Sequence, residues 1–169
     1  VLMKEKLFIF SNESISAKDN KFYCDNIDIK STPEGLKKSY EVNLFGRISN
    51  KIKRTHEIKI NKIKIFSNIF SYMSAAYSAL KNKDSKYLIF SISPFTFVIS
   101  LLIRLSGKKP IVYLRSDGYE EYRAILGKVG PIIYHIMFTV IASVSNLISC
   151  REYILKKKKG KIVNPSQLD

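Results

Sequence analysis

The stretch of residues 113–123 gathers three carboxylates, Asp117, Glu120 and Glu121, in a chain with 14 Asp and Glu against 29 Lys and Arg. A carboxylate of this kind can orient or deprotonate a hydroxyl group of a substrate. It can also cap a helix, because Asp117 and Glu120 have the spacing of a capping box. Asp117 is therefore a candidate helix cap, a candidate acceptor for a substrate hydroxyl, and a candidate general base.

The residues around Asp117 have two alternative roles each. Arg115 either forms an ion pair with Glu120 or binds an anionic acceptor, and a carboxylate beside an arginine stays ionised. Tyr119 and Tyr122 are spaced for opposite sides of a helix turn. One of these rings stacks on a substrate, or both pack inside the protein.

Other catalytic motifs are missing from the sequence. Cys24, Cys150, His56 and His135 are isolated and lack the spacing of a metal site. The patterns GxGxxG, GxxxxGK[ST] and GxSxG are also absent, so the dinucleotide, P-loop and serine-hydrolase chemistries lack their residues. We expect no metal and no cofactor.

The formal charge of +15 is unevenly distributed, with nine Lys and Arg against two Glu in residues 37–64. Such an excess favours an anionic partner. We expect no nucleic acid, because the sequence has no RNP-type motif, zinc-finger spacing or GxxG loop. Residues 37–64 either attach the protein peripherally to an anionic membrane surface or keep it soluble.

Apolar runs and helix signals alternate along the chain. This order predicts an α/β fold, a doubly wound and mostly parallel Rossmann-like sheet with helices on both faces. The predicted strands cover 6–11, 41–47, 62–67, 86–93, 109–117 and 146–150. The predicted helices cover 32–40, 68–83, 94–107, 118–145 (divided near Gly130 and Pro131) and 151–159, with an irregular basic excursion at 48–61.

Two helices have specific expectations. Thr32, before Pro33 and Glu34, predicts the start of the first helix. The helix at 68–83 is expected to pack one face on the sheet. That face contains Ile69, Met73, Ala76, Tyr77 and Leu80.

In sheets of this type, ligands bind beyond the carboxyl ends of the strands. Asn12 and Glu13 follow the first predicted strand and form either a turn or part of a pocket. Ser93 and Arg151 open helices and are either caps or substrate contacts. The candidate site thus consists of Asp117 as the catalytic residue, with Asn12, Glu13, Ser93, Arg115, Tyr119, Glu120 and Arg151 as substrate-binding residues.

Two uncharged apolar stretches, 87–103 and 129–150, are long enough to cross a membrane. Pro94 divides the first stretch, which favours a strand followed by a buried helix. The second stretch contains His135 and Asn146, which favour a buried helix followed by a short strand. The alternative to this α/β interpretation is a small integral membrane protein with spanning helices at 87–106 and 129–150.

The order of "PIVYLRSDGYEEY", a long helix, "SNLISCREYIL" and "GKIVNPSQLD" resembles the N-terminal, acceptor-side domain of GT-B glycosyltransferases of the retaining, glycogen-synthase-like group. The resemblance covers most of the chain by architecture and these segments by motif. Three features differ from the family pattern, and one of them is the absence of the second, donor-binding domain. The usual His is replaced by residues 115–117, and residues 164–169 lack the Asn-Gly-Val-Asp turn.

The resemblance implies transfer of a sugar from a nucleotide-sugar donor to a saccharide or lipid-linked acceptor, in surface polysaccharide or glycolipid synthesis. It implies a cytoplasmic protein that works at the inner face of the cytoplasmic membrane. Residues 1–164 would form the acceptor-side domain, with Asn12 and Glu13 lining the acceptor pocket. Residues 165–169 would begin the linker to a donor-binding domain that this sequence does not contain, and the chain alone would be inactive.

Overall fold

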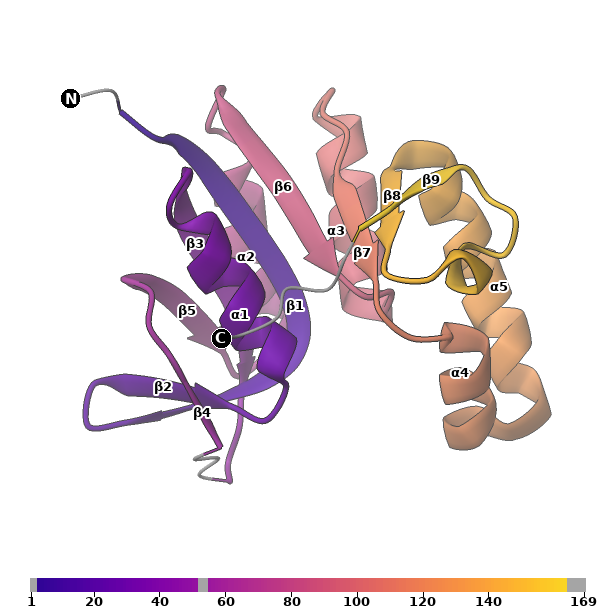
Figure 1. The fold of residues 1–169 in the computed structure, drawn as a ribbon, viewed down its shortest axis with the longest axis horizontal. Helices are drawn as coiled ribbons and strands as arrows, with labels where there is room; N and C mark the ends of the chain where they lie inside the picture. Colours follow the sequence, from indigo (N-terminus) through magenta and orange to yellow (C-terminus); the bar gives the residue numbers. More distant parts are fainter. Residues whose placement is uncertain (1–2, 52–54, 164–169) are drawn as a thin grey trace. The chain divides into compact units, whose positions relative to one another are not determined.

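The computed structural model describes residues 3–51 and 55–163 (Figure 1). The chain divides into two compact units, within Val1–Tyr87 and Leu88–Pro165, and we describe each by itself. Both units combine strands with helices, and most strand pairs are parallel. The predicted α/β class with a largely parallel sheet is confirmed, whereas the predicted linker at 165–169 lies outside the described residues.

The first unit is built on a mixed sheet. β1 pairs in parallel with β3, and β3 with β5, whereas β2 pairs antiparallel with both β1 and β4. The buried apolar run at residues 7–10 places β1 in the core. The strands are β1 (Glu5–Lys18), β2 (Lys21–Cys24), β3 (Tyr40–Ile48), β4 (His56–Ile58) and β5 (Lys62–Phe66). Of these, β4 lies within the predicted irregular excursion.

β1 extends beyond its predicted end. The register with β3 shifts between Phe10 and Ser14, and the strand then continues to Lys18. The Ser11 hydroxyl accepts a hydrogen bond from the Glu13 amide (2.9 Å) inside this irregularity. The prediction that Asn12 and Glu13 follow the strand was therefore wrong, because a bulge absorbs these polar residues without ending the strand.

The first helix, α1 (Ile27–Leu36), begins five residues before its predicted start. Asn26 caps it by accepting a hydrogen bond from the Asp28 amide (3.1 Å). Pro33, which was expected to open the helix, lies inside it. The prediction of a helix over 32–40 was wrong because the earlier asparagine cap determines the start.

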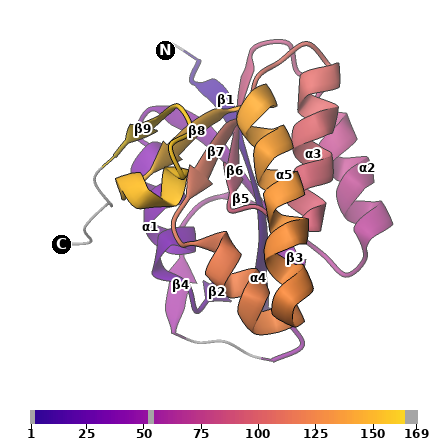
Figure 2. The ribbon, with the colours of Figure 1, turned by 90° about the vertical axis from the view of Figure 1, so that its right-hand side faces the viewer.

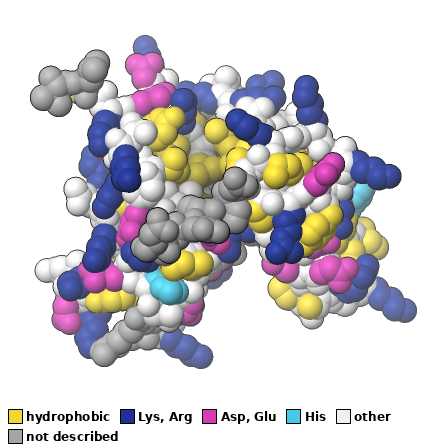
Figure 3. Space-filling view, viewed as in Figure 1, with side chains coloured by type: hydrophobic (Ala, Val, Ile, Leu, Met, Phe, Trp, Pro, Cys, Tyr) yellow, Lys and Arg dark blue, Asp and Glu magenta, His cyan; other side chains and the backbone are white. Residues whose placement is uncertain are grey.

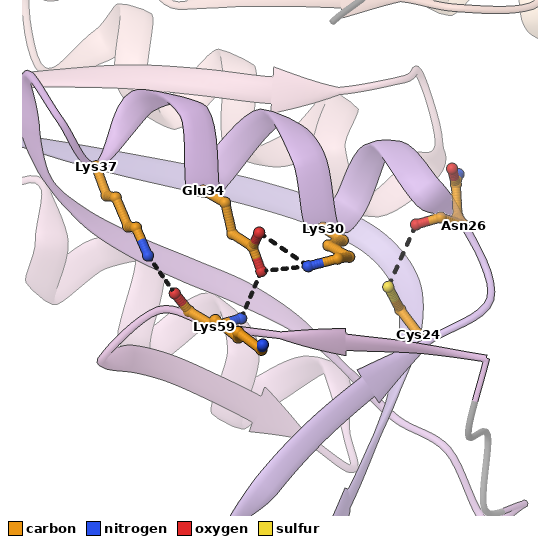
Figure 4. Close-up of polar contacts among 6 residues, drawn as sticks. All are labelled: Cys24, Asn26, Lys30, Glu34, Lys37 and Lys59. Atoms are coloured by element: carbon orange, nitrogen blue, oxygen red, sulfur yellow. Dashed lines mark hydrogen bonds and ion pairs between the residues drawn. The ribbon is translucent and has the colours of Figure 1, made fainter. Parts of the chain in front are cut away.

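A clamp around Glu34 holds α1 against the segment after β4 (Figure 4). The Glu34 carboxylate accepts hydrogen bonds from the Lys30 ammonium (2.8 Å) and from the Lys59 amide (2.7 Å). Lys37 donates to the Lys59 carbonyl (3.0 Å). Burial raises the pKa of the Glu34 carboxyl. The bonds from Lys30 and Lys59, with the charges of Lys30 and Lys37, outweigh that effect and lower the pKa below its ordinary value of 4.5.

The second helix, α2 (Ile69–Ala79), is capped by Asn68 and docks through Tyr72. The Tyr72 hydroxyl donates to the Ser11 carbonyl (2.8 Å) and accepts from the Ser11 amide (3.0 Å). Ile69 and Tyr77, predicted to face the sheet, are exposed. The buried tyrosine sets the rotation of the helix, so the predicted face was wrong at these two positions.

The second unit has an all-parallel sheet in which β6, β7, β8 and β9 pair in that order. α3 and α5 pack against each other (Figure 2). The strands are β6 (Ser85–Phe90), β7 (Ile111–Leu114), β8 (Asn146–Ser149) and β9 (Gly160–Ile162). The helices are α3 (Pro94–Leu105), α4 (Gly118–Leu126), α5 (Gly130–Val144) and the short η1 (Gly127–Val129) and η2 (Glu152–Leu155). The predicted division of the long helix near Gly130 is confirmed.

Two glycines allow α4 and α5 to approach closely. A Cβ atom at Gly118 would overlap the ring of Tyr134, and one at Gly130 would overlap the carbonyl oxygen of Tyr122. The ring and the carbonyl cannot move without displacing a helix. The close contact between α4 and α5 therefore requires glycine, which has no side chain, at positions 118 and 130.

The segments considered as membrane spans are not single helices. Residues 87–106 contain the end of β6 and the 12-residue α3, and residues 129–150 contain the 15-residue α5 and β8. A spanning helix needs about 20 residues. One described helical run, Gly118–Val144, is long and apolar enough by length and composition. Gly127, with a φ of 64°, interrupts it.

We predict that Glu34→Gln lowers the free energy of unfolding by roughly 1–2 kcal/mol at neutral pH, because it removes a charged hydrogen-bond acceptor. The folded-state pKa is depressed, so this contribution is complete above about pH 4.5 and disappears as the pH falls through the folded value. Urea unfolding at a series of pH values should show the two proteins converging in acid. The matched control is Glu5→Gln, because Glu5 pairs with Lys86 on the surface. It should change stability by less than about 0.5 kcal/mol.

We predict that Gly130→Ala lowers the free energy of unfolding by about 1–3 kcal/mol through overpacking. The matched control is Gly35→Ala, since a Cβ at Gly35 meets nothing within 4 Å. That change should be neutral or stabilise by up to about 1 kcal/mol, as Ala favours a helix more than Gly. Equal stability of the two variants in chemical denaturation would contradict the close approach of α4 and α5.

Candidate functional site

Asp117 lies between the end of β7 and the start of α4, and both of its carboxylate oxygens are engaged. Oδ1 accepts from the Tyr119 amide (3.0 Å), and Oδ2 accepts from the Lys156 ammonium (2.7 Å). The side chain is 17% exposed. The predicted helix cap is confirmed, and the carboxylate has in addition a lysine partner.

The predicted capping box is not completed by Glu120. Its carboxylate pairs with Arg123 on the helix surface (3.1 Å), and Asp117 caps through the second amide of the helix instead of the third. Glu121 accepts a hydrogen bond from the Ser116 hydroxyl. Both glutamates therefore lie in the first turn of α4, where their negative charges stabilise the positive end of the helix dipole.

Lys156 is the residue that sequence analysis missed. It follows η2 in a left-handed conformation, with a φ of 47°. Its ammonium lies 5.5 Å from the ring centre of Tyr119 and 6.0 Å from that of Tyr153. Lys156 therefore lies close to the Asp117 carboxylate and to the rings of Tyr119 and Tyr153. The side chain of Tyr153 is 56% exposed, so part of its ring is accessible to a ligand.

Tyr119 and Tyr122 both face α5, contrary to the prediction of opposite sides. Their ring centres lie 4.8 Å and 5.3 Å from that of Tyr134. The Tyr119 hydroxyl is 2.8 Å from His135 Nδ1. Burial raises the pKa of Tyr119, an effect that Lys156 opposes and Asp117 reinforces. Tyr119 therefore stays a neutral phenol and keeps a hydroxyl that can donate or accept.

Ser93 is a helix cap. Its hydroxyl accepts from the Thr96 amide (3.2 Å), and its own amide donates to the Thr96 hydroxyl (2.8 Å). This pair forms a capping box at the start of α3, and Ser93 is only 8% exposed. Capping alone accounts for Ser93, and its predicted substrate contact stays a prediction.

Arg115 and Arg151 follow two neighbouring strands. β7 and β8 pair in parallel with Leu114 opposite Ser149, so the segments after them leave the sheet at the same edge. The Cys150 thiol donates to the Arg115 carbonyl (3.8 Å), which links the two segments. The Arg151 amide donates to the Ser149 hydroxyl (3.3 Å), and the Arg151 side chain is exposed. The predicted helix after Arg151 is the single short turn of η2.

Asn12 and Glu13 belong to the first unit and hold its own elements together. Arg47 donates to the Asn12 side chain (3.4 Å), which links β3 to β1. Asn26 donates to the Glu13 carboxylate (3.2 Å), which links the cap of α1 to β1. Their predicted part in an acceptor pocket stays a prediction.

The first unit also has an open hollow of about 750 Å³ at the amino ends of β3 and β5. Five of its eleven lining residues are lysines, and the lining comes from residues 37–62 and from the segment before β1. The lining includes Lys4, Lys37, Lys38, Lys59 and Lys62, with Glu41 as the acid. None of the candidate site residues lines it.

The second unit therefore brings together Asp117, Tyr119, Lys156 and Tyr153, with Arg115 and Arg151 beyond the same strand ends. Such an arrangement can accept and donate hydrogen bonds to a hydroxylated ligand and offers a partly exposed ring for stacking. No family model, curated protein or solved structure matches the chain.

Proposed function

We propose that the chain is the acceptor-side part of a GT-B glycosyltransferase that transfers a sugar from a nucleotide-sugar donor to a saccharide or lipid-linked acceptor. Its sheet would be one doubly wound half of that fold. The observation that carries the proposal is the position of Asp117 after a parallel strand, next to Lys156 and two tyrosine rings. Ligands of parallel α/β sheets bind at this edge.

The chemistry of the cluster suits a sugar acceptor. Sugar rings present several hydroxyl groups and an apolar face, so a binding site needs both charged hydrogen-bonding groups and an aromatic surface. Asp117 accepts from a hydroxyl, Lys156 donates to another, and the exposed ring of Tyr153 covers the apolar face. Arg115 and Arg151 favour an acceptor that carries a negative charge.

The geometry supports a positioning role for Asp117 more than the role of a general base. Both carboxylate oxygens already accept hydrogen bonds, one of them from an ammonium group. An engaged carboxylate is a good hydrogen-bond acceptor and a weak base. As the resemblance suggests, the leaving phosphate of the donor would then take the proton from the acceptor.

The reaction fits surface polysaccharide or glycolipid synthesis on the cytoplasmic side of a membrane. The described residues that form the cluster include no glycine-rich phosphate loop, so the donor nucleotide would bind mainly to a second domain. Arg115, Arg151 and Lys156 would face the acceptor in such an enzyme.

The proposal is tested by NMR titration of the ¹⁵N-labelled chain with methyl glucoside, methyl galactoside, N-acetylglucosamine and glucuronic acid. We predict that at least one of these sugars shifts the amide signals of Gly118, Tyr119 and Lys156. Asp117→Asn keeps the helix cap, because Asn and Asp are similar caps, but it removes the charge. It should weaken binding by about tenfold or more, since a charged hydrogen bond to the sugar is lost.

The control variant is Glu121→Gln, because Glu121 lies on the same helix turn and its carboxylate accepts a hydrogen bond from the Ser116 hydroxyl. It should leave sugar binding unchanged. Sugar-induced shifts that avoid the Asp117 region, or none with any of the four sugars, would contradict the proposed site. Micromolar binding of UDP-glucose to this chain would contradict the proposed separation of donor and acceptor domains.

A further inference from the structure

The turn between α4 and α5 exposes a group of aliphatic side chains. Ile125 is 75% exposed, Val129 57%, Ile132 62% and Ile136 58%. Together with Leu126 they form what we call the hairpin tip. In Figure 3, hydrophobic side chains gather at the lower right, where Figure 1 places α4 and α5. Contiguous exposed apolar surface of this kind marks an interaction site.

Within α5, the most exposed aliphatic side chains lie toward the turn with α4. Along the outer face of α5, the exposed isoleucines give way to Thr139 and Ser143 toward the end of the helix. The opposite face of the same helix is buried through Tyr134, Phe138 and Ile141. The binding partner therefore contacts the end of the helix pair and not its whole length.

The charges of this region are separated along α4. Glu120 and Glu121 lie in its first turn, and Arg123 is already paired with Glu120 (3.1 Å). Lys128 lies within the turn itself, exposed and without an ion pair among the residues that the structure describes. A tip with exposed aliphatic groups and an exposed lysine complements an apolar layer under an anionic surface.

We propose that the hairpin tip inserts into the surface of an anionic lipid bilayer. Two features favour lipid over a second protein surface. The tip has no Tyr, Trp or Phe, which are the usual anchors of protein interfaces, and it carries an exposed lysine, which such interfaces avoid. The break at Gly127 divides the helical run, so the tip enters the interface as a hairpin and not as a single spanning rod.

This contact differs from the basic segment at residues 37–64 that the sequence suggested. It is carried by apolar side chains of the second unit, with Lys128 supplying the attraction to anionic lipid. It does not rest on the proposed sugar site, whose NMR test uses no lipid. The two proposals can therefore fail separately.

The chain has no tryptophan, which allows a single fluorescent probe to be placed at the tip. Ile132→Trp should show a blue-shifted emission with vesicles made of equal parts phosphatidylglycerol and phosphatidylcholine, and quenching by lipids with brominated acyl chains. The matched control is Leu105→Trp, at the end of α3, where the leucine is 84% exposed. Its emission should not respond to vesicles.

The affinity is tested by vesicle sedimentation with a second set of variants. Ile125→Gln combined with Ile132→Gln should weaken binding about tenfold, because two inserted aliphatic side chains become polar. Phe70→Gln combined with Leu105→Gln removes side chains that are 83% and 84% exposed, and it should bind as the parent does. Circular dichroism checks that all variants are folded.

Three results would overturn the proposal. The first is an Ile132→Trp emission that is the same with and without vesicles. The second is vesicle binding that survives the glutamine pair at the tip. The third is a lipid-free dimer in analytical ultracentrifugation that the same glutamine pair dissociates, which would identify the tip as an interface between two copies.

Discussion

The Asp117 carboxylate connects three parts of the second unit. Through one oxygen it fixes the start of α4 after β7, and through the other it holds Lys156 in the turn after η2. Tyr119, on the amide that Asp117 caps, packs its ring on Tyr134 of α5. The positions of Lys156 and Tyr119 in the cluster therefore depend on the Asp117 side chain. The direction in which α4 leaves β7 toward α5 depends on it as well. Asp117 can cap α4 and also hold Lys156 because its two carboxylate oxygens have different partners.

The packing around this contact leaves little freedom. Gly118 and Gly130 bring α4 and α5 together where any side chain would overlap a ring or a carbonyl. Tyr134 then fills the space between the helices, and its burial raises the pKa of its hydroxyl. A close contact on the inner side of the pair turns the aliphatic residues at the hairpin tip outward. The sugar site and the lipid contact that we propose thus arise from one rigid arrangement.

Local signals predicted much of this arrangement. The Ser93 cap, the Asp117 cap and the break near Gly130 follow from short-range rules that residues within one turn decide. The start of α1 was missed because Asn26 offers an earlier cap and the helix accommodates Pro33. Lys156 was missed because it is one of four consecutive lysines, and only a left-handed turn selects it. The bulge at Asn12 and Glu13 depends on pairing with a distant strand.

Asp117 and Lys156 form the ion pair around which the cluster of the second unit is organised. The most direct measurement is a double-mutant cycle of Asp117→Asn and Lys156→Met, with unfolding free energies from urea denaturation. We predict that the two losses are not additive and that the coupling energy is about 0.5–1.5 kcal/mol. Losses that add within error would show that the two residues are neighbours without a stabilising interaction, and that their ion pair does not organise the cluster.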